Sequence, residues 1–334
     1  MTNIETRNVE PDEAGMRLDR WFREHFPDLS FGHLQKLLRS GQVRVDGGRV
    51  KTSTRLDSGQ AVRIPPLGVA AGASARRPGI AGVSDKTGPD ADFLSSILLH
   101  ADNQVLVFDK PAGLAVQGGS GLTRHIDAML ESLRDRKGQK PRLVHRLDRD
   151  TSGVLVVART RLAASKLAAS FRTRSTRKIY WALVKGVPKP RQGRISTWLA
   201  RGEGAESERM RVARHGDDDS THAVSLYSVA EQAGQKLAWL TMRPVTGRTH
   251  QLRAHAAHIG NPIIGDAKYF EADTNWDFPG GMQNKLHLHA RRIVMPHPAG
   301  GTIDVTAPLP PHMQQSWNLL GFDVASIGEP DDDD

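Results

Sequence analysis

The first part of the chain predicts two amphipathic helices. In the first one, apolar side chains recur at helical spacing. They are Leu18, Trp21, Phe22 and Phe26. The second helix is expected between Ser30, a suitable N-cap, and Gly41, a suitable helix end. Its apolar side consists of Phe31, Leu34, Leu37 and Leu38.

Short strands are expected after these helices. Val43 and Val45 alternate with polar residues, and Asp46 with Gly47 forms a strong hairpin signal. Residues 61–64 predict a further short strand. Together these elements predict a small α/β unit over residues 15–66.

Two segments have a composition that is not typical of folded structure. Residues 67–92 are rich in Gly, Ala, Pro and Ser and contain few bulky apolar residues, which predicts a flexible linker. Residues 323–334 end in a run of acids and predict a disordered tail.

A larger domain is expected over residues 93–322. Apolar segments predict strands at 105–108, 154–158, 179–184, 223–229 and 237–242. Helical patterns follow Gly121, Thr160 and Thr249, and they do not alternate regularly with the strands. We therefore predict an α+β fold with a mixed, mostly antiparallel sheet, not a doubly wound parallel one.

The composition is typical of a globular protein. The chain has 334 residues, enough for one large and one small domain, and 38% of them are apolar. It contains no cysteine, which excludes disulfides and thiolate chemistry and agrees with a reducing compartment. Its first 15 residues are polar and acidic, and no apolar segment is long enough to span a bilayer. We expect a cytoplasmic protein that does not act at a membrane.

The charge is strongly positive outside the tail. The chain has 46 basic and 37 acidic residues, a net charge of +9. Five of the acids are Glu329 and Asp331 to Asp334, so the rest of the chain carries 46 basic against 32 acidic residues, or +14. Such a surface attracts polyanions. Because no basic amphipathic helix with a bulky apolar face stands out, nucleic acid is a better prediction than anionic lipid.

The most specific chemical signal is the segment His145–Gly153. Asp148 lies between Arg146 and Arg149, directly before an apolar strand pattern. Nearby positive charge favours the ionised carboxylate, which is then available as a nucleophile or base. The same residues also suit a turn in which the Asp148 and Asp150 side chains bond to the backbone.

This segment closely resembles the signature of the pseudouridine synthases that modify ribosomal and transfer RNA, in the family that includes the large-subunit rRNA synthases. Further blocks match in the expected order and cover most of residues 93–320. They are Asp109–Gly113, Lys178–Val184, Thr246–Arg253 and Gly260–Asp266. Four blocks in order are far more specific than any one of them.

The resemblance implies roles for individual residues. Asp148 would be the catalytic residue, and Arg253 its ion-pair partner on a helix that Thr249 caps. Tyr180 would pack on the uracil and is a candidate for removing its C5 proton. Arg146 would fill the place that the flipped base leaves in the RNA stack, or contact a phosphate. Without the resemblance, Tyr180 is typical of a strand core and Arg253 of a solvated surface.

The reaction of this family sets the chemical requirements. It breaks the bond between the ribose C1′ and uracil N1, turns the base and rejoins it through C5. No redox change, energy input or metal is needed, so we expect no cofactor. The resemblance also implies a long mixed sheet with helices and loops around a central cleft, which agrees with the predicted fold class.

The N-terminal unit resembles the S4 RNA-binding domain, which joins two helices to a small sheet. Its predicted RNA face combines basic residues that gather mainly on the second helix and the strands after it. They are Arg17, Lys36, Arg39, Arg44, Arg49 and Lys51. We expect a monomer that binds RNA, either 23S rRNA or an assembly intermediate of the large subunit.

Several alternatives remain open at this point. Residues 115–121 look most like the C-type large-subunit rRNA enzyme, although Gln117 stands where a histidine is frequent. The D-type enzyme and a synthase acting on transfer RNA are alternatives. A non-catalytic S4-type ribosome-assembly factor would share the basic body but would not need Asp148, Tyr180 and Arg253 together.

A metal-dependent hydrolase is the weakest alternative, and it would have to use the histidines. These are His250, His255, His258, His287 and His289. Their spacing departs from the usual zinc helix motif, and no acidic residue stands among the first three. We expect no metal and interpret these histidines as RNA contacts.

Overall fold

The structure is a computed structural model that describes residues 4–26, 29, 31–67, 88–119, 123–135, 137–173, 175–202, 209–217, 219–270 and 280–324. Most of the predicted linker, nearly all of the predicted acidic tail and the expected cap Ser30 lie outside these residues. None of the helices in the described ranges has the length and apolarity needed to cross a bilayer.

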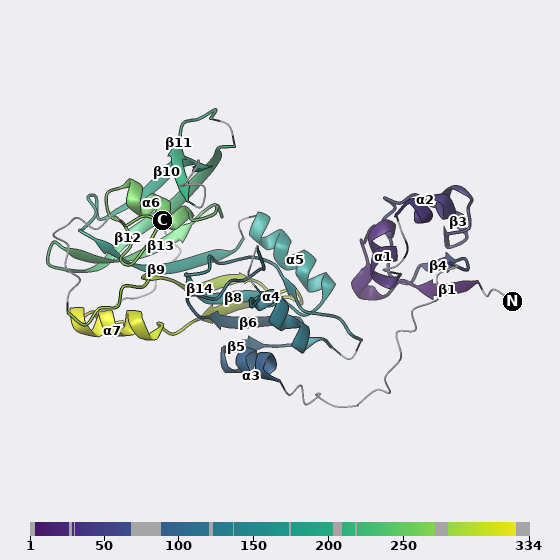
Figure 1. Cartoon of the computed structure of the whole chain (residues 1–334), viewed down its shortest axis with the longest axis horizontal. Coiled ribbons are helices and arrows are strands. Elements are labelled where there is room, and N and C mark those ends of the chain that lie inside the picture. Colours follow the sequence, from purple (N-terminus) through teal and green to yellow (C-terminus); the bar gives the residue numbers. More distant parts are fainter. Residues whose placement is uncertain are drawn as a thin grey trace.

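The N-terminal unit combines helices with a four-stranded antiparallel sheet (Figure 1). Its elements are β1 (Glu5–Asn8), η1 (Pro11–Glu13), α1 (Leu18–His25), α2 (Phe31–Arg39), β2 (Arg44–Val45), β3 (Gly48–Arg49) and β4 (Ala61–Ile64). The strand order is β1-β4-β2-β3. Asp46 and Gly47, with φ of 49° and 77°, turn the chain between β2 and β3, as the sequence predicts. Because β1 pairs with β4, the folded unit starts ten residues before the predicted residue 15.

The helices of this unit bury most of the side chains that the periodicity selects. Trp21 and Phe22 of α1 are buried, as are Leu37 and the other leucines of α2. Phe31 is a correction, since 56% of it is exposed. It is the first residue of α2 and lies outside the packed core of the unit.

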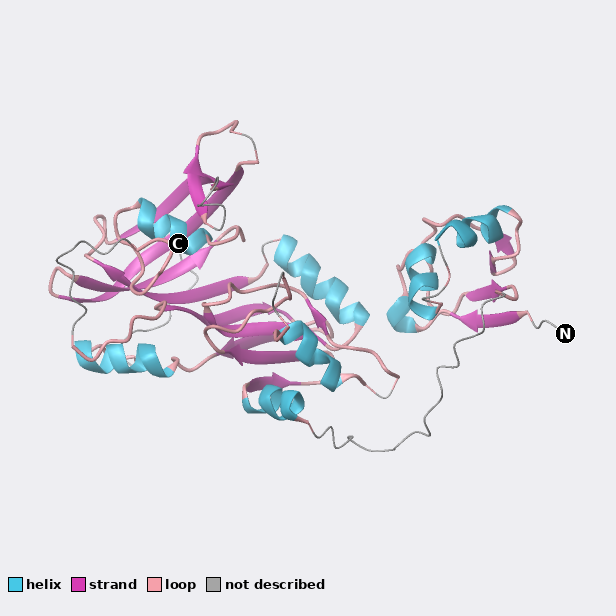
Figure 2. Cartoon of the chain, in the orientation of Figure 1, coloured by secondary structure: helices cyan, strands magenta, loops and turns pink. Residues whose placement is uncertain are grey.

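The second unit is built on a sheet of 11 strands with helices around it (Figure 2). Its strands are β5 (Leu98–Ala101), β6 (Val105–Lys110), β7 (Arg142–Leu143), β8 (Ser152–Ala158), β9 (Arg177–Lys185), β10 (Gln192–Arg201), β11 (Met210–Ala213), β12 (Thr221–Ala233), β13 (Leu237–Pro244), β14 (Leu288–Pro296) and β15 (Thr302–Thr306). Its helices are α3 (Pro89–Ser96), α4 (Ile126–Met129), η2 (Leu130–Leu133), α5 (Arg161–Arg172), α6 (Gln251–His258) and α7 (Pro311–Leu320).

The main path of the sheet runs β11-β10-β12-β13-β9-β14-β8-β6-β5. Strand β7 pairs with β8, and β15 pairs with β14. Among the named strands of the described chain, only β8 and β14 run parallel. The predicted α+β class with a mixed, mostly antiparallel sheet is therefore confirmed.

Strand β8 is buried along its whole length because helices cover both of its faces. Val154 and Val156 pack in one core with Leu167 of α5. Leu155 packs in another core with Met129 of α4. This explains why the sequence shows a continuous apolar run here and no alternation.

Strand β9 alternates, and its two faces meet different helices. Tyr180 and Ala182 face the core that includes residues of α6. Trp181 and Leu183 lie in the core with Trp317 of α7. The two faces of this strand therefore pack on different helices, and the alternation directs Tyr180 to the side of α6.

Helix α3 corrects the predicted start of the larger domain. The helix begins at Pro89, four residues before Phe93. Proline suits the first turn of a helix, where a free N–H is not needed. Ala91 and Leu94 are buried, so residues 89–92 belong to the folded domain and not to a flexible linker.

Three of the histidines predicted to contact RNA are instead part of the core, because His255, His287 and His289 have no exposed surface. His255 is hydrogen-bonded to Ser225 and Thr197, both at 2.9 Å. His287 and His289 likewise have hydrogen-bond partners in the protein. No group of three or more His, Asp or Glu side chains in the described ranges is arranged to hold a metal.

Gly153 permits the parallel contact between β8 and β14. Its φ is 108°, and its register partner is Ala290. A Cβ at this position would overlap the backbone of Ala290. The contact therefore requires glycine for two reasons, the backbone conformation and the close approach of the strands.

We predict that Gly153→Ala lowers the free energy of unfolding of the larger domain by several kcal/mol, since it adds a backbone clash to a left-handed conformation. The control is Gly234→Ala, at a φ of 60° with no atom within 4 Å of the added Cβ. That variant should lose only about 1–2 kcal/mol. Urea denaturation measures both, and equal losses would contradict the clash.

Acid should destabilise the protein through its buried histidines. Burial lowers the pKa of His255 and His287 to about 4 and that of His289 to about 3, from an ordinary value of 6.5. Below pH 6.5 the unfolded chain binds protons at these sites that the folded chain does not, so stability decreases as pH falls. Each histidine should contribute about 2 kcal/mol of loss at pH 5. Unfolding free energies that are equal at pH 7.5 and pH 5 would contradict this burial.

Candidate active site

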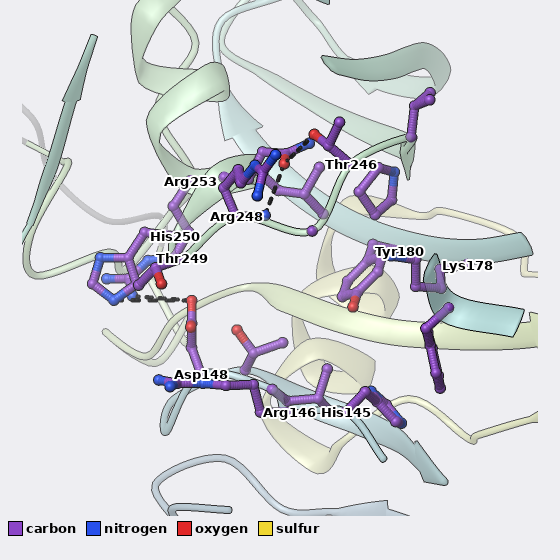
Figure 3. Close-up of a pocket in the computed structure, with 18 of the residues that line it drawn as sticks. His145, Arg146, Asp148, Lys178, Tyr180, Thr246, Arg248, Thr249, His250 and Arg253 are labelled. Carbon is purple, nitrogen blue, oxygen red and sulfur yellow. Dashed lines mark hydrogen bonds and ion pairs between the residues drawn. The ribbon is translucent and has the colours of Figure 1, made fainter. Parts of the chain in front are cut away.

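A cleft of about 620 Å³ opens beside the loop that precedes β8 (Figure 3). Its walls come from that loop, the end of α5, the start of β9, residues 244–250 and the first turn of α6. Asp148, Tyr180 and Arg253, which belong to three separate blocks of the sequence, all line it. The fold therefore brings the three predicted site residues into one cavity.

Lys110 is hydrogen-bonded to the loop that carries Asp148. This lysine has no exposed surface, and its Nζ donates to the carbonyl oxygens of Pro111, Leu114 and Arg149 at 2.8 to 3.0 Å. Burial lowers the pKa of Lys110 to about 7, although the charges of nearby aspartates oppose this. The three bonds tie the first sequence block to the residue that follows Asp148.

Arg253 has two carboxylate neighbours, and the nearer one is Asp266. Its Nε and Nη2 each donate to Asp266 at 2.7 Å, while Nη1 lies 3.7 Å from Oδ2 of Asp148. Burial opposes the charged form, but the hydrogen bonds and charge of Asp266 raise the pKa of Arg253, so it remains a cation. The predicted neighbour of Asp148 is present, and a second, buried aspartate fixes its orientation.

His250 is a second neighbour of Asp148. Its Nε2 lies 3.9 Å from Oδ2 of Asp148, and its Nδ1 is 3.1 Å from the hydroxyl of Tyr269. That hydroxyl already accepts a bond from the backbone N–H of Met210, so its own proton is directed to Nδ1. Burial lowers the pKa of His250. A neutral ring with this partner carries its hydrogen on Nε2, on the side of Asp148.

The start of α6 differs from the expectation that Thr249 caps it. The N-cap residue is His250, in a left-handed conformation with a φ of 51°. The side-chain oxygen of Gln251 accepts bonds from the Arg248 backbone N–H at 3.0 Å and the Thr246 hydroxyl at 2.7 Å. The left-handed turn places the ring of His250 next to the carboxylate, as Figure 3 shows.

Sequence reasoning assigned no role to Asp266 or Lys110, and it interpreted His250 only as an RNA contact. Each lies in a block that carries the family resemblance, but nothing in the spacing of the blocks shows that these side chains meet. Asp266 follows Gly265, whose left-handed φ of 71° is the local signal of a tight turn at this point. The contacts join separate segments of the chain: Lys110 to Arg149, His250 to Asp148, and Asp266 to Arg253.

Tyr180 lies on β9 in the wall of the cleft (Figure 3). Burial raises the pKa of its hydroxyl well above the ordinary value, and the charge of Asp148 raises it further. The phenol is therefore protonated at neutral pH. This favours packing against a base over removal of a proton by a free phenolate.

The rest of the cleft is basic. Asp148 is the only acidic residue among the described residues that line it. The cations in its walls are Arg146, Arg172, Lys178, Arg248 and Arg253. Arg146 is exposed. It lies in the same loop as Asp148, two residues before it. This charge suits a polyanion and agrees with the charge of the whole chain.

The predicted RNA face of the N-terminal unit is partly assembled. Arg44 and Arg49 are register partners in the β2–β3 hairpin, and Arg49 lies against Gly41 at the end of α2. Lys36 and Arg39 are exposed in the last turn of that helix, and Lys51 is exposed two residues after Arg49. Arg17 is not part of this group of contacts, because it precedes α1 and pairs with Asp19. All remain predictions as RNA contacts.

Known proteins resemble the chain over both units. Residues 104–258 match the family described as RNA pseudouridylate synthase, and residues 16–62 match the S4 domain. Ribosomal large subunit pseudouridine synthase C of Vibrio cholerae is 35% identical, over 96% of this chain and 98% of the relative. RNA pseudouridine synthase 4, mitochondrial, of Arabidopsis thaliana is 36% identical, over 90% of this chain and 78% of the relative.

The fold leads to the same family. The solved structure of human RNA Pseudouridylate Synthase Domain Containing 4 matches with a TM-score of 0.58 and 28% identity, over 69% of this chain and 95% of that chain. The similarity to curated relatives extends over nearly the whole length of both chains. The chain therefore belongs to the RNA pseudouridine synthase family and carries an S4 domain ahead of its synthase domain.

Proposed function

We propose that this enzyme isomerises specific uridines of 23S ribosomal RNA to pseudouridine, with Asp148 as the catalytic carboxylate. The observation that carries the proposal is the meeting of Asp148, Tyr180 and Arg253 in a cleft whose other charged residues are all cations. A non-catalytic assembly factor has no need for such a carboxylate. The relatives named ribosomal large subunit pseudouridine synthase C support the choice of RNA.

Asp148 supplies the reacting group in this proposal. The guanidinium of Arg253 lies 3.7 Å from Oδ2 of Asp148 and the ring of His250 lies 3.9 Å from the same oxygen, so both groups can hold the carboxylate in place. A carboxylate held beside the target nucleotide can assist cleavage of the bond from C1′ to N1, and the walls of the cleft can retain the detached base until it rejoins through C5. The reaction is redox-neutral and needs no cofactor.

In this proposal Tyr180 contacts the extruded base, and Arg146 contacts the RNA at the position that the base leaves. The protonated phenol of Tyr180 offers a flat face on which the uracil packs while it turns. Extruding a stacked base costs about a few kcal/mol. Arg146 stands exposed at the entrance, where its planar guanidinium can replace the base in the stack or bind a phosphate.

The proposed RNA target follows the relatives named ribosomal large subunit pseudouridine synthase C. The C-type large-subunit enzymes are the best comparison, and we expect a cytoplasmic monomer that acts on 23S rRNA or on assembly intermediates. The D-type rRNA enzyme and a transfer-RNA enzyme are the alternatives. Mapping pseudouridines in ribosomal and transfer RNA from a deletion strain decides among them, because the missing positions identify the substrate directly.

Asp148→Asn should abolish turnover, at least about 1,000-fold, while RNA affinity stays within a few fold. The change removes a reacting oxygen anion but little contact area. Release of tritium from RNA labelled at uridine C5 measures the reaction, and filter binding measures affinity. Asp150→Asn is the matched control, since this exposed carboxylate of the same loop does not line the cleft. Turnover by pure Asp148→Asn would refute the assignment.

Arg253→Lys should lower single-turnover activity by about 100-fold with little change in RNA affinity. Lysine keeps the charge, but it cannot hold Asp266 with two parallel bonds while facing Asp148. The control is Arg292→Lys, which alters a similar two-bond pair with Asp304 outside the cleft and should keep its activity. Near-normal rates for Arg253→Lys would show that the orientation of the guanidinium is unimportant.

A further inference from the structure

A second cavity, of about 520 Å³, lies beside the candidate active site. It is formed where β9 begins and where β13 and β14 end, and the start of β15 closes it. Pro244 and Val245 line both this cavity and the cleft that contains Asp148. The two cavities are therefore separated by a shared wall.

One wall of the second cavity contains a buried hydroxyl without a partner. Thr176 is only 9% exposed, and its Oγ1 has no hydrogen-bond partner in the part of the chain that the structure describes. Leaving such a group unsatisfied costs about 1–3 kcal/mol. Since Thr176 lines the cavity, a ligand with an acceptor oxygen there would remove this cost.

The charge of the cavity indicates which ligand fits. Arg177 and Arg243 line it, and none of its described lining residues is acidic. Asp304 is close enough for the charge of Arg177 to lower its pKa, but hydrogen bonds from Arg292 lower that pKa more. Two guanidinium groups and one free hydroxyl are suited to phosphate oxygens.

Strand β9 contributes a basic side chain to each of the two cavities. Side chains alternate along β9, so Arg177 lines the second cavity while the next residue, Lys178, lines the cleft. An RNA strand whose target base enters the cleft must continue past its rim. Phosphates of the nucleotides next to the target would then lie within reach of the second cavity.

We propose that Arg177, Arg243 and Thr176 form a binding site for a backbone phosphate of the RNA strand that flanks the target uridine. The inference rests on the proposed function, since it places the strand relative to the cleft. It adds a sequence-independent contact that positions the RNA, while the chemistry stays with the residues around Asp148.

The first test compares Arg243→Gln with Lys236→Gln. Lys236 is exposed just before the other end of the same strand, so both variants lose one positive charge. Arg243→Gln should bind the 23S rRNA fragment about tenfold more weakly. Its log affinity should depend less steeply on log salt, by about 0.7–0.9 per lost contact. At saturating RNA its single-turnover rate should stay within twofold of the parent. Equal affinity and salt slope for the two variants would overturn the proposal.

The second test is Thr176→Val, which removes the buried hydroxyl without removing a charge. In free protein this change should be neutral or stabilising, because the hydroxyl has no hydrogen-bond partner among the described residues. If phosphate binds, RNA affinity should fall several fold with no loss of thermal stability. An RNA affinity equal to that of the parent would overturn the proposal.

A third measurement separates RNA from a free anion. Inorganic phosphate, compared with chloride at equal ionic strength, should weaken RNA binding to the parent and not to Arg243→Gln. If phosphate binds the parent but Arg243→Gln leaves RNA affinity unchanged, the occupant is a free anion and the proposal fails. If the parent forms no pseudouridine in any RNA, the proposed function fails. The binding measurements test the phosphate site independently of that result.

Discussion

The geometry of the candidate active site depends on the buried ion pair between Arg253 and Asp266. Neither side chain has much access to water, and a buried charge without a partner costs several kcal/mol. Two hydrogen bonds of 2.7 Å and the backbone N–H groups of Lys268 and Tyr269 satisfy the carboxylate. Because Asp266 occupies Nε and Nη2, only Nη1 of the guanidinium is directed toward Asp148.

Two glycines and a lysine make this arrangement possible in the backbone. Gly265, directly before Asp266, has a left-handed conformation and approaches Lys285 so closely that a Cβ would overlap its carbonyl group. Gly153, at the start of β8 and just after the loop that carries Asp148, approaches Ala290 so closely that a Cβ would overlap the backbone of Ala290. Lys110 binds the carbonyl of Arg149 from the other side of this loop. The carboxylate and its partner are thus held by elements that are themselves fixed against the sheet.

The basic residues and the carboxylate of the cleft serve different purposes in the proposed function: the basic residues attract RNA, and the carboxylate takes part in the chemistry. Cations surround the cleft, two arginines line the neighbouring cavity, and basic residues gather at the end of α2 and the β2–β3 hairpin. One carboxylate stands among them in the cleft. A positive field of this kind attracts the RNA backbone over long range.

The sequence by itself determined the elements and the family. The local sequence pattern predicted the strands β6, β8, β9, β12 and β13 and the buried face of α1, because apolar runs and apolar periodicity depend on nearby positions only. The motif blocks identified the region around Asp148, Tyr180 and Arg253. Tertiary structure decided which groups meet. It placed Asp266 beside Arg253 and His250 beside Asp148, buried three histidines in the core, and gave the Thr176 hydroxyl no partner within the described ranges. These contacts join residues that are distant in the chain, and their strength depends on burial, which a one-dimensional pattern does not contain.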